Sequence, residues 1–336
     1  MSSELSADEL ALYDRQLRVW GAEGQNRIKN ASVLLINFNG VGTEIVKNLV
    51  LSGIGSLEIW DQAKVKESDF NSQFFLTEED LNEIKLNNNV KHRISDMNPR
   101  VKISVNTNEL EFDDAEYFKN FNLVIANEID YGQIIQLNRT TRALNIALYI
   151  TQVHGVFGFV FSDLILDVSK YTEIKNPIGR SIGKISSNQE IIEVKKFFDQ
   201  ESEKVKETFT LKSTYKQFEE IYQSENLKSL TRRNKKRVNP LLSIFLAYIQ
   251  SGLTSVEELK IKTNEVQSSF GLNEIEDLKY FEKFINQLKI EISPVTAIIG
   301  GSVAQDIINF LSKKVAPFNN VFILDGEEYV MPIYEL

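Results

Sequence analysis

The chain has 336 residues, of which 42% are hydrophobic and 25% charged, and its formal net charge is −9; this composition is typical of a globular protein and excludes a disordered or fibrous chain. It contains no cysteine and only two histidines, which excludes disulfides, thiolate metal sites and a cysteine thioester carrier and argues against a histidine metal centre. The acidic N-terminus lacks signal-peptide features, and no window approaches about eighteen consecutive apolar residues. The negative charge argues against non-specific nucleic-acid binding. We therefore expect a cytosolic or nuclear protein without a membrane span.

The N-terminal half alternates predicted helices and strands. Ser6, with Glu9 three residues later, is a capping box that predicts a helix over the run Leu10 to Trp20. The stretch "SVLLIN" predicts a buried strand, and a helix follows from about residue 42 to 51. Further strands are predicted at 56–61, 101–106, 122–127 and 147–152, and helices at 78–99 and 134–145. This alternation predicts a Rossmann-like, doubly wound and mostly parallel sheet in an α/β fold.

The pattern changes after residue 152. Residues 155–169 are dense in aromatic and β-branched side chains and predict a hairpin or meander, with weaker strand candidates at 191–200 and 206–215. A polar, basic stretch at 226–239 predicts an exposed loop. Helices are predicted at 240–250, 255–266, 275–288 and 295–314, and a last strand at 320–325. The predicted organisation is an N-terminal helical arm (1–30), a Rossmann-like core (30–175), a variable insert with a basic loop (176–239) and a part that completes the same fold (240–336).

The turn after the first strand resembles a dinucleotide-binding fingerprint with two of its glycines replaced. Gly40 and Gly42 supply the tight turn and the close helix packing, but Asn37 and Asn39 put side chains where a phosphate needs bare backbone. Asn tolerates a positive φ, so the backbone shape can persist. Asp61 ends the second strand, where a dinucleotide enzyme places its ribose-binding acid. These residues favour a structural remnant over a competent nucleotide site.

Several blocks along the chain resemble the ubiquitin-like modifier activating enzymes. They are "ALYDRQLRVWGAEGQNRIKNASVLLINFNGVGTEIVKNLVLSGIGSLEIWD", "NSQFFL", "SDMNPRV", "PVTAIIGGSVAQDIINFLSKK" and "NNVFILDG", in the family's order. The chain lacks a separate cysteine domain, and in this respect it is most similar to the smaller, non-cysteine subunits of the heterodimeric SUMO-activating enzymes. The resemblance implies a ThiF/MoeB-type adenylation fold with a C-terminal α+β extension.

The same resemblance shows which functional residues are absent. Active members of the family have a ribose-binding acid where this chain has Ala63, and a phosphate-contacting arginine where it has Ser72. The ATP-binding lysine aligns near Leu86, one residue from Lys85. Glu128 and Asp130 are imperfect candidates for the adenylation aspartate. The resemblance therefore implies that this chain binds no cofactor or metal itself and that ATP and Mg²⁺ belong to the partner subunit.

The motif "YDRQLRVW" carries the candidate catalytic residue. From the residues alone, Arg15 and Arg18 are ordinary surface cations of an amphipathic helix. The resemblance implies instead that Arg15 reaches across a dimer interface into the partner's ATP site. It leaves Tyr13, Arg18 and Trp20 as packing or interface residues.

Other candidates are weaker. The basic run "TRRNKKR", Thr231 to Arg237, is a solvated loop or a nuclear-import signal, which leads us to expect a location in the nucleus and also the cytoplasm. His154 lacks a second catalytic group and predicts a structural or crossover-loop residue. The pair Gly300 and Gly301 lacks the preceding strand of a phosphate loop and predicts close helix packing.

The resemblance implies a non-catalytic subunit of a SUMO-activating enzyme. Its partners would be the large catalytic subunit and, through the complex, SUMO and the conjugating enzyme, with no nucleic acid and no membrane. Three alternatives stay open: a homodimeric adenylating enzyme of the sulfur-carrier type, an NAD(P)-binding oxidoreductase favoured by Asp61, and a pure scaffold in which Arg15 has no role.

Overall fold

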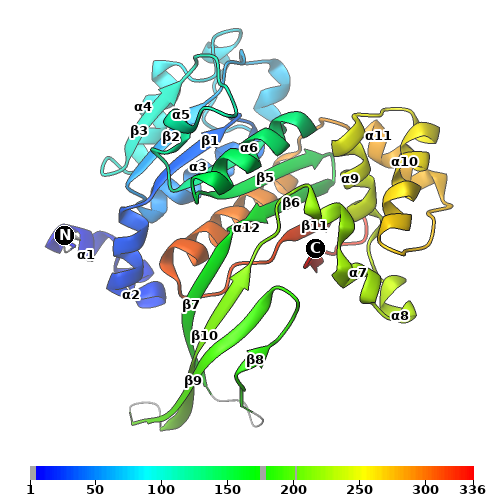
Figure 1. The fold of residues 1–336 in the computed structure, drawn as a ribbon. Helices are drawn as coiled ribbons and strands as arrows, with labels where there is room; N and C mark the ends of the chain where they lie inside the picture. Colours follow the sequence, from blue (N-terminus) through cyan, green and yellow to red (C-terminus); the bar gives the residue numbers. More distant parts are fainter. Residues whose placement is uncertain (1–4, 175–178, 201–202) are drawn as a thin grey trace.

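A computed structural model describes residues 5–174, 179–200 and 203–336. Its centre is an eight-stranded sheet in the order β12-β11-β6-β5-β4-β1-β2-β3 (Figure 1). The first four residues of the predicted helical arm and the start of the predicted insert lie outside the described residues. The strands of this sheet are β1 (Ser32–Ile36), β2 (Ser56–Trp60), β3 (Lys102–Asn106), β4 (Leu123–Asn127), β5 (Ala147–His154), β6 (Phe157–Asp163), β11 (Val321–Asp325) and β12 (Ile333–Tyr334).

Five strands of the sheet are parallel, as the alternation of strands and helices predicts. β1 lies between β2 and β4 and is parallel to both, with Leu35 level with Ile59 and Ile125. β2 continues to β3 and β4 to β5 in the same direction, whereas β6, β11 and β12 add antiparallel strands at one edge. The predicted α/β, Rossmann-like fold is confirmed.

Helices cover both faces of the sheet, so the inner strands are buried on both sides. Within β1, Val33 and Leu35 belong to one hydrophobic core, and Leu34 and Ile36 to the other, as the two-residue period of a strand requires. The helices are α1 (Ala7–Leu12), α2 (Asp14–Lys29), α3 (Gly40–Ser52), α4 (Asn88–Met97), α5 (Ala115–Phe118), α6 (Tyr131–Ala143), α7 (Glu225–Ser229), α8 (Arg232–Lys235), α9 (Pro240–Ser251), α10 (Val256–Ser269), α11 (Leu278–Asn286) and α12 (Ser293–Ser312).

α3 and α12 pack closely on the first face. A Cβ built on Gly300 would lie 2.5 Å from the Cβ of Glu44, so only glycine allows this approach. The predicted packing role of Gly300 is confirmed; Gly301 has open space at its Cβ position. α12 is long and apolar enough to cross a membrane by length and composition alone, but it contributes buried Ile299, Val303 and Ile307 to the core of this chain.

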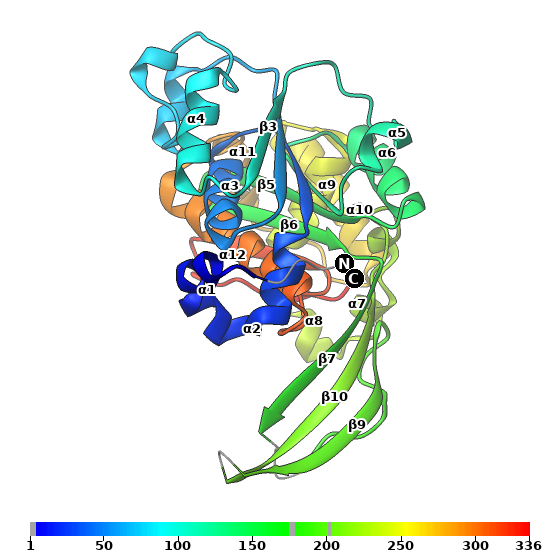
Figure 2. The ribbon, with the colours of Figure 1, turned by 90° about the vertical axis from the view of Figure 1, so that its left-hand side faces the viewer.

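A second sheet projects away from the body of the molecule (Figures 1 and 2). It has the order β7-β10-β9-β8 and is antiparallel throughout; we call it the arm. Its strands are β7 (Leu166–Ile174), β8 (Gly183–Lys184), β9 (Gln189–Asp199) and β10 (Lys204–Thr214). The arm begins at Leu166, within the range 30–175 predicted for the core, because β7 pairs with β10 and not with β6.

Four local predictions are wrong. The helix predicted over Leu10 to Trp20 is divided at Tyr13, which ends α1 and precedes α2. Residues 78–99 do not form one helix: a 3₁₀ turn at Glu78–Asp80 precedes irregular chain, and α4 begins after its N-cap Asn87, whose side chain accepts from the Val90 amide. Residues 155–169 divide between β6 and β7, which belong to different sheets. The basic stretch is not one loop, because it contains α7 and α8, each with a side-chain N-cap (Ser224 and Thr231).

Candidate functional site

The candidate site lies at the carboxyl ends of β1 and β4, between which the order of the parallel strands reverses. Open α/β sheets bind their ligands at this position. A cavity of about 630 Å³ opens here, lined by residues from the β1–α3 turn, the segment after β2, the end of β4 and the segment before α12. The predicted candidates Asn37, Asn39, Asp61, Ala63, Lys85 and Glu128 all line it.

The N-terminus of α3 already holds an anion, and it comes from this chain. The Gly40 amide donates to Oε2 of Glu291 at 2.9 Å, and the Ser72 hydroxyl donates to the same oxygen at 2.9 Å. The first amides of a helix form the anion site that a nucleotide phosphate uses in this type of fold. Glu291 therefore occupies the anion position at the N-terminus of α3, and the Ser72 hydroxyl supports the same carboxylate oxygen.

Asn37 and Asn39 keep the turn in place by different means. Asn37 has a φ of 65°, as expected of a residue that tolerates the left-handed region. Its side-chain amide donates to the Asn127 carbonyl at 2.7 Å, and the Asn127 amide donates back to the Asn37 carbonyl at 2.8 Å. Asn39 is the N-cap of α3, where its Oδ1 accepts from the Gly42 amide at 2.9 Å. Both side chains serve the backbone of the turn.

Both side-chain oxygens of Asp61 accept a hydrogen bond from a backbone amide. Its Oδ2 accepts from the Phe38 amide at 2.8 Å and its Oδ1 from the Ala63 amide at 2.6 Å. Burial raises the pKa of this carboxyl, against the opposing effect of the Ala63 amide. Asp61 therefore ties the β1–α3 turn to the end of β2, which disfavours the ribose contact of a dinucleotide enzyme.

The remaining candidates separate into those that face the cavity and those that do not. Lys85 lines the cavity and pairs with Asp69 at 3.0 Å, whereas Leu86 is buried in the core. Glu128 lines the cavity, but Asp130 is exposed as the N-cap of α6. Of the candidates for the ATP-binding lysine and the adenylation aspartate, Lys85 and Glu128 thus line the cavity, whereas Leu86 and Asp130 do not.

Glu128 is a poor metal ligand in this setting. Its Oε1 accepts from the Val153 amide at 2.6 Å, and its backbone has a φ of 51°. Burial raises the pKa of its carboxyl to about 8, with a further upward effect of Glu291. A carboxyl that is protonated near neutral pH does not ligate Mg²⁺ well, and no cluster of three or more potential metal ligands occurs among the described residues. Glu128 in this state is therefore poorly suited to hold the metal ion of ATP.

Arg15 lies outside this cavity, near the start of α2. Its side chain is exposed and has no ion pair or hydrogen bond within residues 5–174, 179–200 and 203–336. Arg18, one turn further on, pairs with Asp14 at 2.8 Å across the helix surface. Arg15 is therefore a free guanidinium on the surface, whereas Arg18 is a locally paired one.

Tyr13 and Trp20 face into this chain. They are 4% and 8% exposed. The Tyr13 hydroxyl accepts from the side-chain amide of Asn98 at 2.9 Å, and the Trp20 indole donates to Gln25 at 2.7 Å. Their burial supports packing within the chain and leaves little side-chain area for a partner. An interface role for Tyr13, Arg18 and Trp20 stays a prediction.

His154 is buried at the end of β5. Its Nδ1 accepts from the Lys289 amide at 3.2 Å, and its ring stacks on Phe245 at 5.5 Å between centroids. Burial lowers the pKa of this imidazole to about 4. A neutral ring packed among aromatic side chains agrees with the structural role predicted for it.

Sequence reasoning missed Glu291. It lies 251 positions from Gly40, in a short segment between α11 and α12 that carries no motif. The one signal in the sequence was indirect. The arginine that the resemblance implies at position 72 is absent, and its positive charge would otherwise have paired with a nearby acid.

Comparisons with known proteins place this geometry in a family. The sequence pattern of the ThiF family matches residues 13–333. The chain is 41% identical to DNA damage tolerance protein RHC31 of Saccharomyces cerevisiae, over 99% of this chain and 98% of that one. It is 28% identical to SUMO-activating enzyme subunit 1 of Homo sapiens, over 96% of this chain and 93% of that one. The crystal structure of E. coli MccB with succinimide has a similar fold, with a TM-score of 0.55 at 14% identity over 96% of this chain and 71% of that one.

Proposed function

Because the chain belongs to the ThiF family, we propose that it is the smaller, non-catalytic subunit of a heterodimeric SUMO-activating enzyme. Relatives named SUMO-activating enzyme subunit 1, which align over nearly their whole length, support this assignment. The proposed partner is a large subunit that holds ATP, Mg²⁺ and the thioester cysteine. SUMO and the conjugating enzyme would meet this chain through the complex.

The observation that carries the proposal is the carboxylate of Glu291 on the Gly40 amide. A phosphate group would have to displace a negative charge that is already bonded to the helix terminus and to Ser72. Like charges at close range oppose binding. Adenylation therefore falls to the partner, and this fold acts as a support.

Arg15 is the residue we propose this chain contributes to the reaction. It is exposed and unpaired within the described part of the chain, so it enters an interface without breaking an existing ion pair. A guanidinium is permanently charged and presents a planar fork of donors that suits phosphate oxygens. Supplied from a second subunit, it would complete the partner's site only in the assembled dimer, as arginine fingers do in other phosphoryl-transfer enzymes.

The test is ATP–pyrophosphate exchange by the heterodimer reconstituted from this chain and a large subunit. Arg15→Ala should leave the one-to-one complex intact in size-exclusion chromatography and slow exchange by about ten- to a thousand-fold, the effect of losing one positioned charge. Arg15→Lys should recover part of the rate. Arg18→Ala, on the same helix but already paired with Asp14, is the matched control and should change the rate little.

Two results would contradict the proposal in different ways. A normal complex that exchanges pyrophosphate at the wild-type rate with Arg15→Ala would reduce this chain to a scaffold. Exchange by the chain alone would favour the homodimeric, sulfur-carrier type of enzyme.

We further propose that the protein is nuclear and also cytoplasmic, with the exposed cations between Arg232 and Arg237 as the import signal. The support is their exposure on α8 and the turn after it. Loss of nuclear accumulation on neutralising these residues, with the exchange rate unchanged, is the expected result.

A further inference from the structure

The basic run lies beside the C-terminal segment, and a groove of about 600 Å³ separates them. Lys236, Arg237 and Val238 line one side, and Val330 and Met331 the other. The floor is fixed by hydrogen bonds around Asn239: its amide donates to the Tyr334 hydroxyl at 2.8 Å, and its side chain donates to Asp325 at 2.9 Å. The groove is therefore a defined part of the fold, although its two sides are distant in sequence.

The cations of this run lack partners in the chain. Arg232, Arg233, Lys235, Lys236 and Arg237 form no ion pair within the described residues. Lysines on the helices before and after the run do find one: Lys228 of α7 pairs with Glu225 and Lys262 of α10 with Glu265, each at 2.8 Å. One acid, Glu328, lines the groove. Lys236 and Arg237 line the groove itself, and the other three cations of the run precede them on α8, so positive charge is concentrated on this side of the groove.

The opposite side of the groove is apolar and exposed. Val330 and Met331, which line it, are each 42% exposed, and Tyr329, next to them in the chain, is 91% exposed with a φ of 53°. A bulky residue in the left-handed region at a surface turn is strained, and such strain is concentrated at binding sites. Methionine and tyrosine are enriched at protein interfaces because one adapts its shape and the other combines an apolar ring with a polar tip.

We propose that this groove binds an extended acidic segment of a partner protein that carries a large apolar side chain. The carboxylates would pair with the cations around Lys236 and Arg237, where the guanidinium fork binds a carboxylate through two hydrogen bonds. The apolar side chain would pack on Val330 and Met331. Nucleic acid suits the groove less well, because Tyr280 is the one aromatic side chain among the residues that line the groove, and stacked bases need a series of aromatic rings. The proposal does not rest on the activating function.

The test uses the purified full chain and fluorescence anisotropy at physiological salt. The probe is a fluorescein-labelled peptide of about nine residues, rich in Asp and Glu around a central Leu-Phe pair. Lys236→Glu with Arg237→Glu should weaken its binding by about tenfold or more, since two attractive contacts become repulsive. Arg100→Glu with Lys102→Glu, two exposed cations at the start of β3, is the matched control and should have little effect.

A second pair of variants tests the apolar side. Met331→Ser should weaken binding of the same peptide by about three- to tenfold, the contribution of a partly buried side chain. Ile84→Ser removes an apolar side chain of nearly equal exposure elsewhere on the surface and should change nothing. Replacing Leu-Phe by Ser-Ser in the peptide should weaken binding to the wild-type chain but not further to Met331→Ser.

The proposal fails if charge reversal at 236 and 237 leaves the affinity unchanged, or if the peptide does not bind below about 1 mM. It also fails if a single-stranded oligonucleotide of equal charge binds more tightly than the peptide. Circular dichroism of each variant separates a lost contact from a lost fold.

Discussion

One side chain, Glu291, decides what the α3 terminus can bind. Its carboxylate accepts from both the Gly40 amide and the Ser72 hydroxyl. A negative charge at a helix N-terminus is stabilising because the first amides are unpaired and carry the positive end of the helix dipole. The same contact that closes the phosphate position thus also stabilises the fold.

Glu291→Ala should therefore lower the free energy of unfolding by about 1–3 kcal/mol, because it leaves two part-buried donors without an acceptor. Glu291→Gln keeps a side-chain oxygen and should lose less. Urea unfolding monitored by circular dichroism measures both, with Glu282→Ala, an exposed acid of α11, as a control expected within about 0.5 kcal/mol of wild type. ATP binding gained by Glu291→Ala alone would show that Asp61, Asn39 and Glu128 matter less than we infer.

At the scale of elements, α12 carries a buried acid toward the sheet. Asp306 accepts from the Tyr149 hydroxyl of β5 at 2.7 Å and from the Phe318 amide at 2.9 Å. Burial raises the pKa of this carboxyl to about 7, and nearby Asp167 adds to the increase. Asp167 itself pairs with Lys313 at the C-cap of α12. The packing of α12 is therefore sensitive to pH.

The direction follows from proton uptake. Between about pH 4 and pH 7 the folded state holds a proton on Asp306 that the unfolded chain has released. The protonated Asp306 carboxyl makes its full contribution to stability below about pH 4, and this contribution is lost as the pH rises to about 7. Relative to wild type, Asp306→Asn should gain stability across this window, with a slope of at most about 1.4 kcal/mol per pH unit. Urea unfolding of both proteins at several pH values measures the difference, and the exposed Asp113→Asn should leave the slope as in wild type. Parallel profiles for Asp306→Asn and wild type would show that Asp306 is ionised throughout.

Most elements were predictable because their signals are local. β1 and β4 are continuous apolar runs, α1 has its capping box, and α6 has Asp130 and Gln133 in the same relation. The substitutions at 37, 39, 63 and 72 could also be recognised in the sequence as losses. The contacts of Glu291 at the α3 terminus could not be predicted, because Glu291 and Gly40 are brought together only by the tertiary fold. For the same reason the separation of β7 from β6 was missed: two adjacent apolar strands do not reveal that they pair with different partners.

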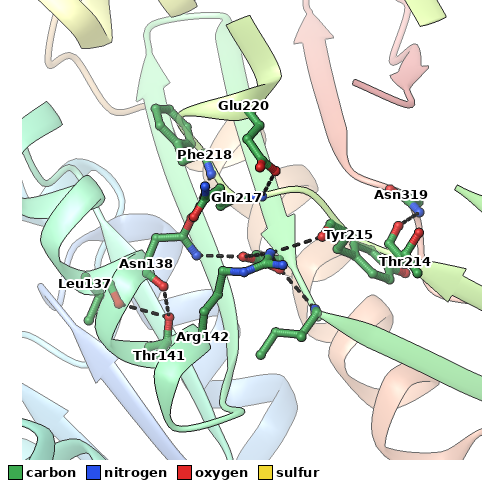
Figure 3. A network of polar contacts seen from close by, with 12 residues as sticks. Leu137, Asn138, Thr141, Arg142, Thr214, Tyr215, Gln217, Phe218, Glu220 and Asn319 are labelled. Carbon is green, nitrogen blue, oxygen red and sulfur yellow. Dashed lines mark hydrogen bonds and ion pairs between the residues drawn. The ribbon is translucent and has the colours of Figure 1, made fainter. Parts of the chain in front are cut away.

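At the scale of the whole molecule, a network of polar contacts helps to join the arm to the body (Figure 3). Asp163, at the end of β6, has a fully buried side chain that pairs with Arg142 of α6 at 2.8 Å and accepts from Asn138 at 2.7 Å. Arg142 also donates to the Tyr215 carbonyl at 3.1 Å, and Asn138 accepts from the Phe218 amide at 2.7 Å. The chain is thus held to α6 both where it enters the arm and where it returns.

Two arginines of α6 allow a matched test of this connection between the arm and the body. Arg142→Ala should lower the free energy of unfolding by about 3 kcal/mol, because it leaves the buried Asp163 charge unpaired. Arg139, three residues before Arg142 on the same helix, is an exposed partner of Glu219. Arg139→Ala should lower the free energy of unfolding by less than about 1 kcal/mol. Thermal unfolding of the two variants makes the comparison. Equal losses of unfolding free energy in the two variants would mean that the ion pair of Asp163 with Arg142 does not hold the arm to the body.

The carboxylate on the α3 terminus also sets a stoichiometry. A symmetric pair of nucleotide-binding folds would hold two nucleotides, one in each half. In the heterodimer we propose, Glu291 fills one of the two equivalent positions permanently, at the Gly40 amide. The complex then has one nucleotide per pair of chains. With no second site there is no cooperativity between sites, so nucleotide occupancy rises as a simple hyperbola, and the smaller chain never competes with its partner for the cell's ATP.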